Sequence, residues 1–149
     1  MIVSQKCQYG LRAILELVKR QGMGPTTVGE IAEAQAIPPR FLELILNQLR
    51  QGGFVESRRG VQGGYILTLP PENLSAGDII RFIDGPLAPV RCVASDKDDN
   101  CPLHGNCAFM GMWIKARDAV ANVYDQTSFQ DLIAEELALA EKYVPSYCI

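Results

Sequence analysis

Hydrophobic positions near the start of the chain recur at helical spacing. One amphipathic helix is indicated by apolar side chains at i, i+3, i+4 and i+7, which are Leu11, Ile14, Leu15 and Val18. A second, shorter helix is expected at residues 28–35, because Thr27 and Glu30 form a capping box at its start. A third is expected at residues 38–51, with a core face of Leu42, Ile45, Leu46 and Leu49.

The periodicity then changes from helical to extended. Residues 54–58 and 65–69 read as two strands, and the connection between them, residues 59–64, is rich in glycine that suits positive φ. Three helices followed by a hairpin is the layout of a winged helix. The predicted fold class is therefore mainly α with a small β-hairpin, with a winged helix-turn-helix DNA-binding domain at residues 1–70.

Residues 71–149 predict a second part made of helices and one irregular loop. A helix is expected to start at a Ser75–Asp78 capping box, and a C-terminal helix at a Ser128–Asp131 box that runs to about residue 144. Between them lie a three-cysteine loop at about 87–107 and a long helix at about 108–124. The heptad-like spacing on the long helix predicts dimerisation through Trp113, Ala116, Val120 and Val123.

The third helix has polar residues opposite its core face, which is what a recognition helix in the major groove requires. These residues are Arg40, Glu43, Asn47 and Arg50. The hairpin adds Arg58 and Arg59 beside a glycine-rich tip that can approach DNA closely. Double-stranded operator DNA is the expected partner. A solvated helix face with an ordinary turn is the alternative reading, and the order of elements favours DNA binding.

Charge distribution changes the picture given by the net charge of -3. Residues 1–70 carry 8 basic and 5 acidic side chains, whereas residues 71–149 carry 6 basic and 12 acidic ones. A basic front and an acidic back would orient the protein on a polyanion. No long apolar run or signal-peptide pattern is visible, so a cytoplasmic location without membrane contact is expected.

Three of the five cysteines, Cys92, Cys101 and Cys107, lie in the irregular loop. Thiols held together in a loop suit a soft metal or a cluster. Zinc is an alternative, because His104 would complete a Cys3His set. Unrelated redox thiols or a disulfide pair are further alternatives. A small metal enzyme is disfavoured, because His104 is the sole histidine and no catalytic or phosphate-loop motif is present.

Several motifs of this chain resemble those of the Rrf family of winged-helix transcription regulators (IscR, NsrR, RirA and CymR type). They are Tyr9-Gly10-Leu11, Ile31-Ala32-Glu33, Phe41-Leu42-Glu43 and above all the wing at residues 59–67, followed by the three cysteines and a Trp-bearing helix. The resemblance implies a homodimer and a [2Fe-2S] or [4Fe-4S] iron–sulfur cluster on the cysteines. It further implies that Glu43 and Arg59 read DNA. The regulator would sense iron, redox state or nitric oxide.

A cluster bound by Cys92, Cys101 and Cys107 would still need a fourth ligand. The resemblance places the partner subunit's first helix near the cluster, where this chain offers the thiol of Cys7. His104 is the second candidate. The alternative for Cys7 is a small side chain buried in helix packing.

Overall fold

The computed structural model describes residues 2–94 and 101–143. Its helices are α1 (Gln5–Lys19), α2 (Val28–Gln35), α3 (Pro39–Gln51), α4 (Ala76–Asp84), α5 (Met110–Asp125) and α6 (Phe129–Lys142). Two strands, β1 (Val55–Arg58) and β2 (Gly64–Leu67), and two short 3-10 helices, η1 (Pro71–Asn73) and η2 (Arg91–Val93), complete it. The predicted class, mainly α with a winged hairpin, is confirmed.

Local capping explains why the helices start where they do. The Ser4 side chain accepts a hydrogen bond from the Cys7 backbone N–H at the start of α1. Complete capping boxes open α2, α4 and α6, as the sequence predicts. In each box the side chain of the first residue accepts a hydrogen bond from the backbone N–H three residues later, and the acidic side chain there accepts one from the backbone N–H of the first. The two 3-10 helices, by contrast, are not predicted from the sequence.

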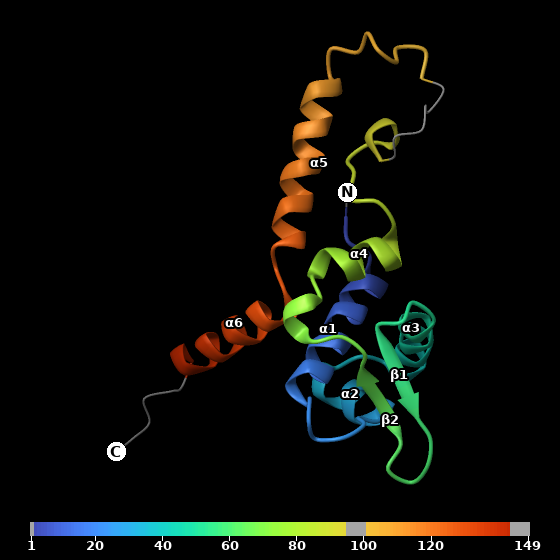
Figure 1. Cartoon of the computed structure of the whole chain (residues 1–149), viewed down its shortest axis with the longest axis vertical. Helices are drawn as coiled ribbons and strands as arrows, with labels where there is room; N and C mark the ends of the chain where they lie inside the picture. Colours follow the sequence, from blue (N-terminus) through green and yellow to red (C-terminus); the bar gives the residue numbers. More distant parts are fainter. Residues whose placement is uncertain (1, 95–100, 144–149) are drawn as a thin grey trace.

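The wing is an antiparallel hairpin in which Val55 pairs with Leu67 and Arg58 with Gly64. Tyr65 also exchanges two backbone hydrogen bonds with Thr26, at 2.8 and 3.0 Å, which ties the hairpin to the segment before α2. Gly64 allows this close approach, since a Cβ there would lie 2.5 Å from the backbone of Thr26. The wing is therefore held at its base, and its glycine-rich tip extends beyond the body (Figure 1).

The main hydrophobic core joins α1, α2 and α3 to residues far along the chain. Leu74, Ile79 on α4 and Phe129 at the start of α6 are buried in the same cluster as Ile14 and Leu46. Phe129 is 0% exposed. The core thus extends past residue 70, where the sequence divides the chain, and includes the first turn of α6.

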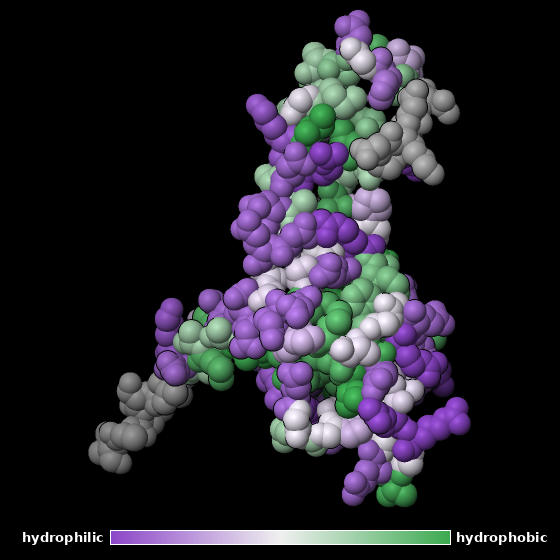
Figure 2. All heavy atoms as spheres, in the orientation of Figure 1, coloured by the Kyte–Doolittle hydropathy of each residue, from purple (hydrophilic) through white to green (hydrophobic). Residues whose placement is uncertain are grey.

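Helix α5 projects from this body (Figure 1). None of its residues is buried, although it is 16 residues long. Hydrophobic side chains gather over its upper half and the segment that precedes it (Figure 2). The helix begins at Met110, slightly later than the predicted start at about residue 108, and residues 102–105 and 108–109 form turns. Loop residues 95–100 and the predicted end of α6 at residue 144 lie outside the described residues.

Candidate nucleic-acid interface and cysteine loop

The predicted recognition helix, α3, presents one face to the core and the other to solvent. Its buried residues are Leu42, Ile45, Leu46 and Leu49. The predicted reading residues Arg40, Glu43, Asn47 and Arg50 are all exposed. Burial of one face fixes the helix axis, so the polar side chains are presented from a rigid support.

The predicted arginines around the wing are not equivalent. Arg50 donates a hydrogen bond from a guanidinium NH2 group to Ser57 Oγ at 3.3 Å, linking α3 to β1. Arg58 donates from Nε and Nη2 to Glu56 Oε1 at 3.0 and 2.6 Å, so its charge is compensated within the wing. The Arg59 side chain is exposed at the tip and forms no hydrogen bond or ion pair with any other described residue. Arg59 is therefore the wing cation most available to a phosphate.

Two large apolar side chains of α3 also lie on its exposed side, and the sequence analysis does not predict them as site residues. Phe41 is 59% exposed and Leu44 is 67% exposed. The helical period could have found Leu44, because it falls between Arg40 and Asn47, one turn from each.

The three loop cysteines are free thiols and all half-buried. Cys92 lies on η2, while Cys101 and Cys107 flank a run of turns in which the His104 N–H donates to the Cys101 carbonyl at 2.9 Å. No group of three or more His, Cys, Asp or Glu side chains in the described part of the chain is arranged to hold a metal ion. The donors match a soft metal in kind, and the stretch 95–100 that separates Cys92 from Cys101 is not described.

Cys7 lies apart from the loop, in a small core cluster with Ile80 and Leu87. It is 0% exposed. Burial, the negative charge of Asp84 and a hydrogen bond to Asp84 raise the pKa of the Cys7 thiol to about 12. Since metals bind the thiolate, this environment favours the packing role that the sequence left open.

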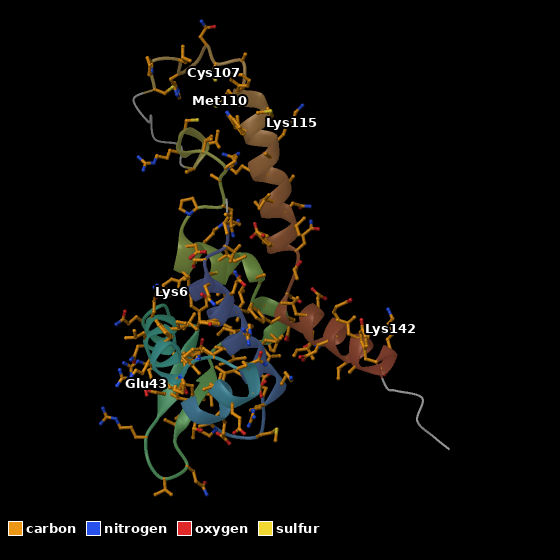
Figure 3. All side chains as sticks on the ribbon, turned by 180° about the vertical axis from the view of Figure 1, so that it is seen from behind. Lys6, Glu43, Cys107, Met110, Lys115 and Lys142 are labelled. Carbon is orange, nitrogen blue, oxygen red and sulfur yellow. The ribbon has the colours of Figure 1, made fainter. Side chains whose placement is uncertain are left out.

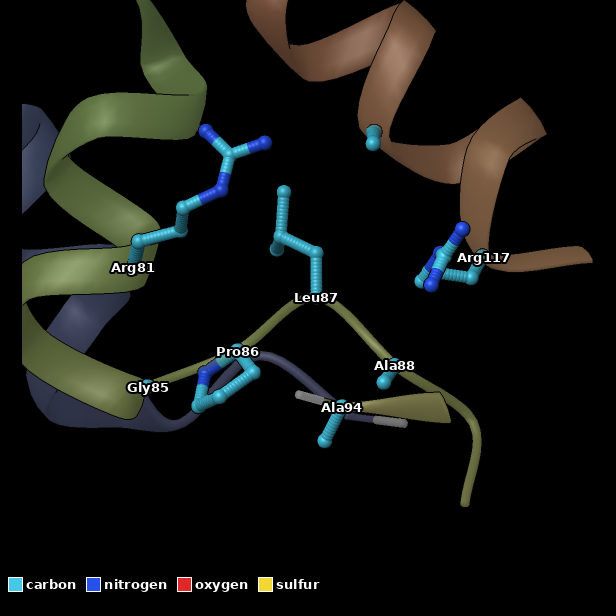
Figure 4. A pocket seen from close by; sticks show the side chains of 8 residues that line it. Arg81, Gly85, Pro86, Leu87, Ala88, Ala94 and Arg117 are labelled. Carbon is cyan, nitrogen blue, oxygen red and sulfur yellow. The ribbon is translucent and has the colours of Figure 1, made fainter. Parts of the chain in front are cut away.

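An open cavity of about 430 Å³ lies where α4, residues 85–94 and α5 meet (Figure 4). Arg81 crosses this junction and forms a two-bond ion pair with the Asp125 carboxylate, at 2.6 and 2.7 Å. Hydrogen bonding from Arg81 lowers the pKa of Asp125. Arg117 of α5 donates to the Val93 carbonyl at 3.2 Å, next to Cys92. The cysteine-bearing η2 is thus tied to α5, and α5 to α4.

Helix α4 in turn packs closely on the DNA-binding unit. A Cβ on Gly52 at the end of α3 would lie 2.5 Å from the Phe82 ring of α4. The Phe82 ring also meets Phe54, just before β1, with centroids 5.0 Å apart. The contacts from Cys92 to α3 and the wing are therefore continuous, although the loop and the reading face lie at opposite ends of the molecule (Figure 3).

The three-helix unit with its basic wing defines a winged helix-turn-helix transcription regulator. Residues 3–135 match the Rrf2 family, described as an iron-dependent transcriptional regulator, and the chain belongs to this family. The expected family membership is confirmed. The relatives are regulators and not enzymes, which removes the metal-enzyme alternative.

Two kinds of relative are similar to this chain. The HTH-type transcriptional regulator CymR of Bacillus subtilis is 37% identical over 144 residues, covering 97% of this chain and 98% of CymR. The solved structure of CymR, the global cysteine regulator of B. subtilis, matches with a TM-score of 0.73 at 38% identity, and the match covers 91% of this chain and 98% of that chain. The structure of T. potens IscR matches with a TM-score of 0.72 at 30% identity, covering 91% and 88%.

Within the described residues, no helix is both long and apolar enough to cross a membrane.

Proposed function

We propose that the protein binds double-stranded operator DNA through α3 and the wing, as a homodimer, and that chemistry at Cys92, Cys101 and Cys107 sets its DNA affinity. The observation that carries the proposal is the exposed polar face of α3 with Arg59 beside it at the wing tip. A helix in the major groove and an arginine-bearing wing near the backbone are the two contacts of a winged-helix reader.

Dimerisation is supported by α5. Val123 is 60% exposed and Met112 is 50% exposed, on a helix with no buried residue. The fold divides the predicted seam, because Ala116 and Val120 line a hollow with Leu87 and Pro89 of their own chain. We place the contact between subunits on the exposed stripe of Met112, Ala119 and Val123, which are spaced 7 and 4 residues apart.

For the loop we propose an iron–sulfur cluster held by Cys92, Cys101 and Cys107. Support comes from the three half-buried thiols and from the family's description as iron-dependent. Such a cluster would supply a reversible bond between η2 and the segment that leads into α5. The chain's own part is to hold the thiols and to carry their displacement through Arg117, α5 and Arg81 to α4.

A thiol or zinc site at the same cysteines is the second candidate, and the similarity to a cysteine regulator favours it. Anaerobic purification with an absorption spectrum and assays of iron and sulfide separates the two. We expect a visible absorption band with iron and sulfide present, both lost in a triple Cys92/Cys101/Cys107→Ala variant. A colourless protein without iron rejects the cluster.

DNA binding is tested by selecting an operator from random duplexes with the full chain and measuring affinity by gel shift. Arg59→Ala should weaken binding and reduce the log–log salt slope by about 0.9 for each lost phosphate contact. Arg58→Ala should have a smaller effect, because Glu56 already pairs with Arg58. Lys142→Ala, at the far end of α6, is the control (Figure 3). Equal affinity of wild type and Arg59→Ala would reject the role of the wing.

A further inference from the structure

The exposed side of α3 carries an apolar patch beside its polar reading residues. Leu44 lies on the side of α3 opposite the buried Leu49, between the polar side chains of Arg40 and Asn47. It is 67% exposed, and Phe41 beside it is 59% exposed. A single exposed leucine is ordinary on a protein surface. These two, however, lie next to the polar side chains that we propose to read DNA.

The surroundings of the two side chains indicate what covers them. Phe41 and Leu44 line one wall of an open groove of about 480 Å³ between α1 and α3. Gln5, Lys6 and Tyr9 of α1 form the other wall, so its rim carries a cation and amide groups but no carboxylate. Lys6 and Glu43 lie on the same side of the molecule (Figure 3). The groove thus shares Leu44 with the exposed side of α3, and its charge suits a phosphate strand.

The geometry points to Leu44, supported by Phe41, as the side chain that contacts the 5-methyl group of thymine in the major groove. Thymine alone among the four bases presents a methyl group there, and apolar side chains recognise it by burying it. Glu43, the neighbouring residue, can accept a hydrogen bond from the amino group of cytosine. Two neighbouring residues of α3 would then favour different bases, Leu44 a thymine and Glu43 a cytosine. This inference rests on the proposed DNA-binding function.

Replacing thymine by uracil in the operator removes only the methyl group, so it tests the contact on the DNA side. Each thymine of the selected operator is replaced singly, and affinities are measured for the wild type, Leu44→Ala and Met23→Ala. Met23 is a matched control, because it is 78% exposed and lies outside α3, in the connection between α1 and α2. Light scattering of each variant checks that its assembly is unchanged.

We expect at least one thymine per half-site at which uracil weakens wild-type binding about fourfold, as for one buried methyl group. Met23→Ala should keep this sensitivity. Leu44→Ala should bind the thymine and uracil duplexes equally, because the methyl group has lost its partner.

Three results would overturn the inference. They are an operator without a uracil-sensitive thymine, equal sensitivity in Leu44→Ala and wild type, and a change of assembly in Leu44→Ala, which would make the patch a contact between subunits. A wild-type protein that selects no duplex would instead reject the proposed DNA-binding function itself, and this inference with it. Binding without methyl dependence would leave the proposed function standing.

Discussion

The DNA-binding unit and helix α5 differ in what holds them. The α1–α4 region packs most of its apolar side chains into the main core, with Ile14, Leu42 and Leu46 all 0% exposed. Helix α5 has no buried residue, and its main ties to the body are the Arg81–Asp125 ion pair and a contact through Tyr124. The first region is stabilised by a core that also includes Phe129 of α6, whereas the second leaves apolar surface for another chain. A regulator built this way can change the angle of α5 without unfolding its DNA reader.

The largest loss of stability is expected at Phe129 of α6, which follows the cysteine loop in sequence but is buried in the main core. Phe129→Ala removes a ring that is 0% exposed and should lower the free energy of unfolding by ~3–5 kcal/mol. Urea denaturation measures it. Leu137→Ala, on the same helix but 62% exposed, should change stability by less than ~0.5 kcal/mol. Equal effects of the two substitutions would show that α6 lies outside the core.

On α5, by contrast, a substitution is expected to change assembly and not the stability of the fold. Val123→Asp places a charge on a side chain that is 60% exposed in one subunit, so it should disturb assembly and leave the fold intact. We expect a monomer by light scattering, normal circular dichroism, and operator affinity reduced about 100-fold through loss of the second half-site.

Asn122→Asp is the matched control for assembly, because it places a carboxylate on the same turn at an exposed polar position. It should remain a dimer. A Val123→Asp protein that keeps the wild-type mass would show that the exposed stripe of α5 is not the contact between subunits.

Local elements and contacts between distant segments differ in how well the sequence alone predicts them. The helices and the hairpin follow from local signals, since capping boxes and apolar periodicity act within a few residues. The burial of Phe129 against α1–α3 was not predicted, because it depends on contacts between distant segments. The same applies to the candidate site: exposure of Arg40 and Glu43 follows from helical period, but the Arg58–Glu56 pair depends on side-chain conformation.

A smaller effect is expected at the one strongly buried carboxylate of the DNA-binding unit. Glu16 is 4% exposed and accepts hydrogen bonds from Arg20 at 2.6 Å and Gln35 at 2.8 Å. Burial opposes its ionisation, yet these hydrogen bonds and the charges of Lys19 and Arg20 prevail and lower the pKa of Glu16. Glu16→Gln should cost ~1–3 kcal/mol of stability at neutral pH.

The pH dependence of this contribution has a definite sign. Because the folded pKa of Glu16 is lowered, its stabilisation is fully present above the unfolded value, about 4.3, and is lost as the pH falls through the folded pKa. Urea midpoints of wild type and Glu16→Gln should therefore converge on acidification from pH ~6 to ~3. A difference that stays constant over this range would mean that the charge of Glu16 is not what stabilises α1 against α2.

The smallest effect on stability, and the most informative for the comparison, is expected at the ion pair between α4 and α5. The Arg81 and Asp125 side chains are 40% and 43% exposed, so solvent screens the pair and Asp125→Asn should cost less than ~1 kcal/mol. Its role would instead be positional. Two parallel hydrogen bonds fix the orientation of α5, and Gly77 leaves room for the carboxylate, since a Cβ there would collide with Asp125.

If displacement at the cysteine loop reaches α3 through the Arg81–Asp125 pair, loosening that pair should make operator affinity independent of the loop cysteines. Operator affinity is measured for intact protein and for the Cys92/Cys101/Cys107→Ala variant, each with and without Asp125→Asn. In the Asp125→Asn background, the ratio of the two affinities should approach one, while the dimer mass and the fold are retained. Gln126→Glu, an exposed change at the end of the same helix, should leave the ratio unchanged. A ratio that Asp125→Asn does not alter would mean that the two regions communicate through the apolar contact at Tyr124 or through the partner subunit, and that the ion pair only anchors α5.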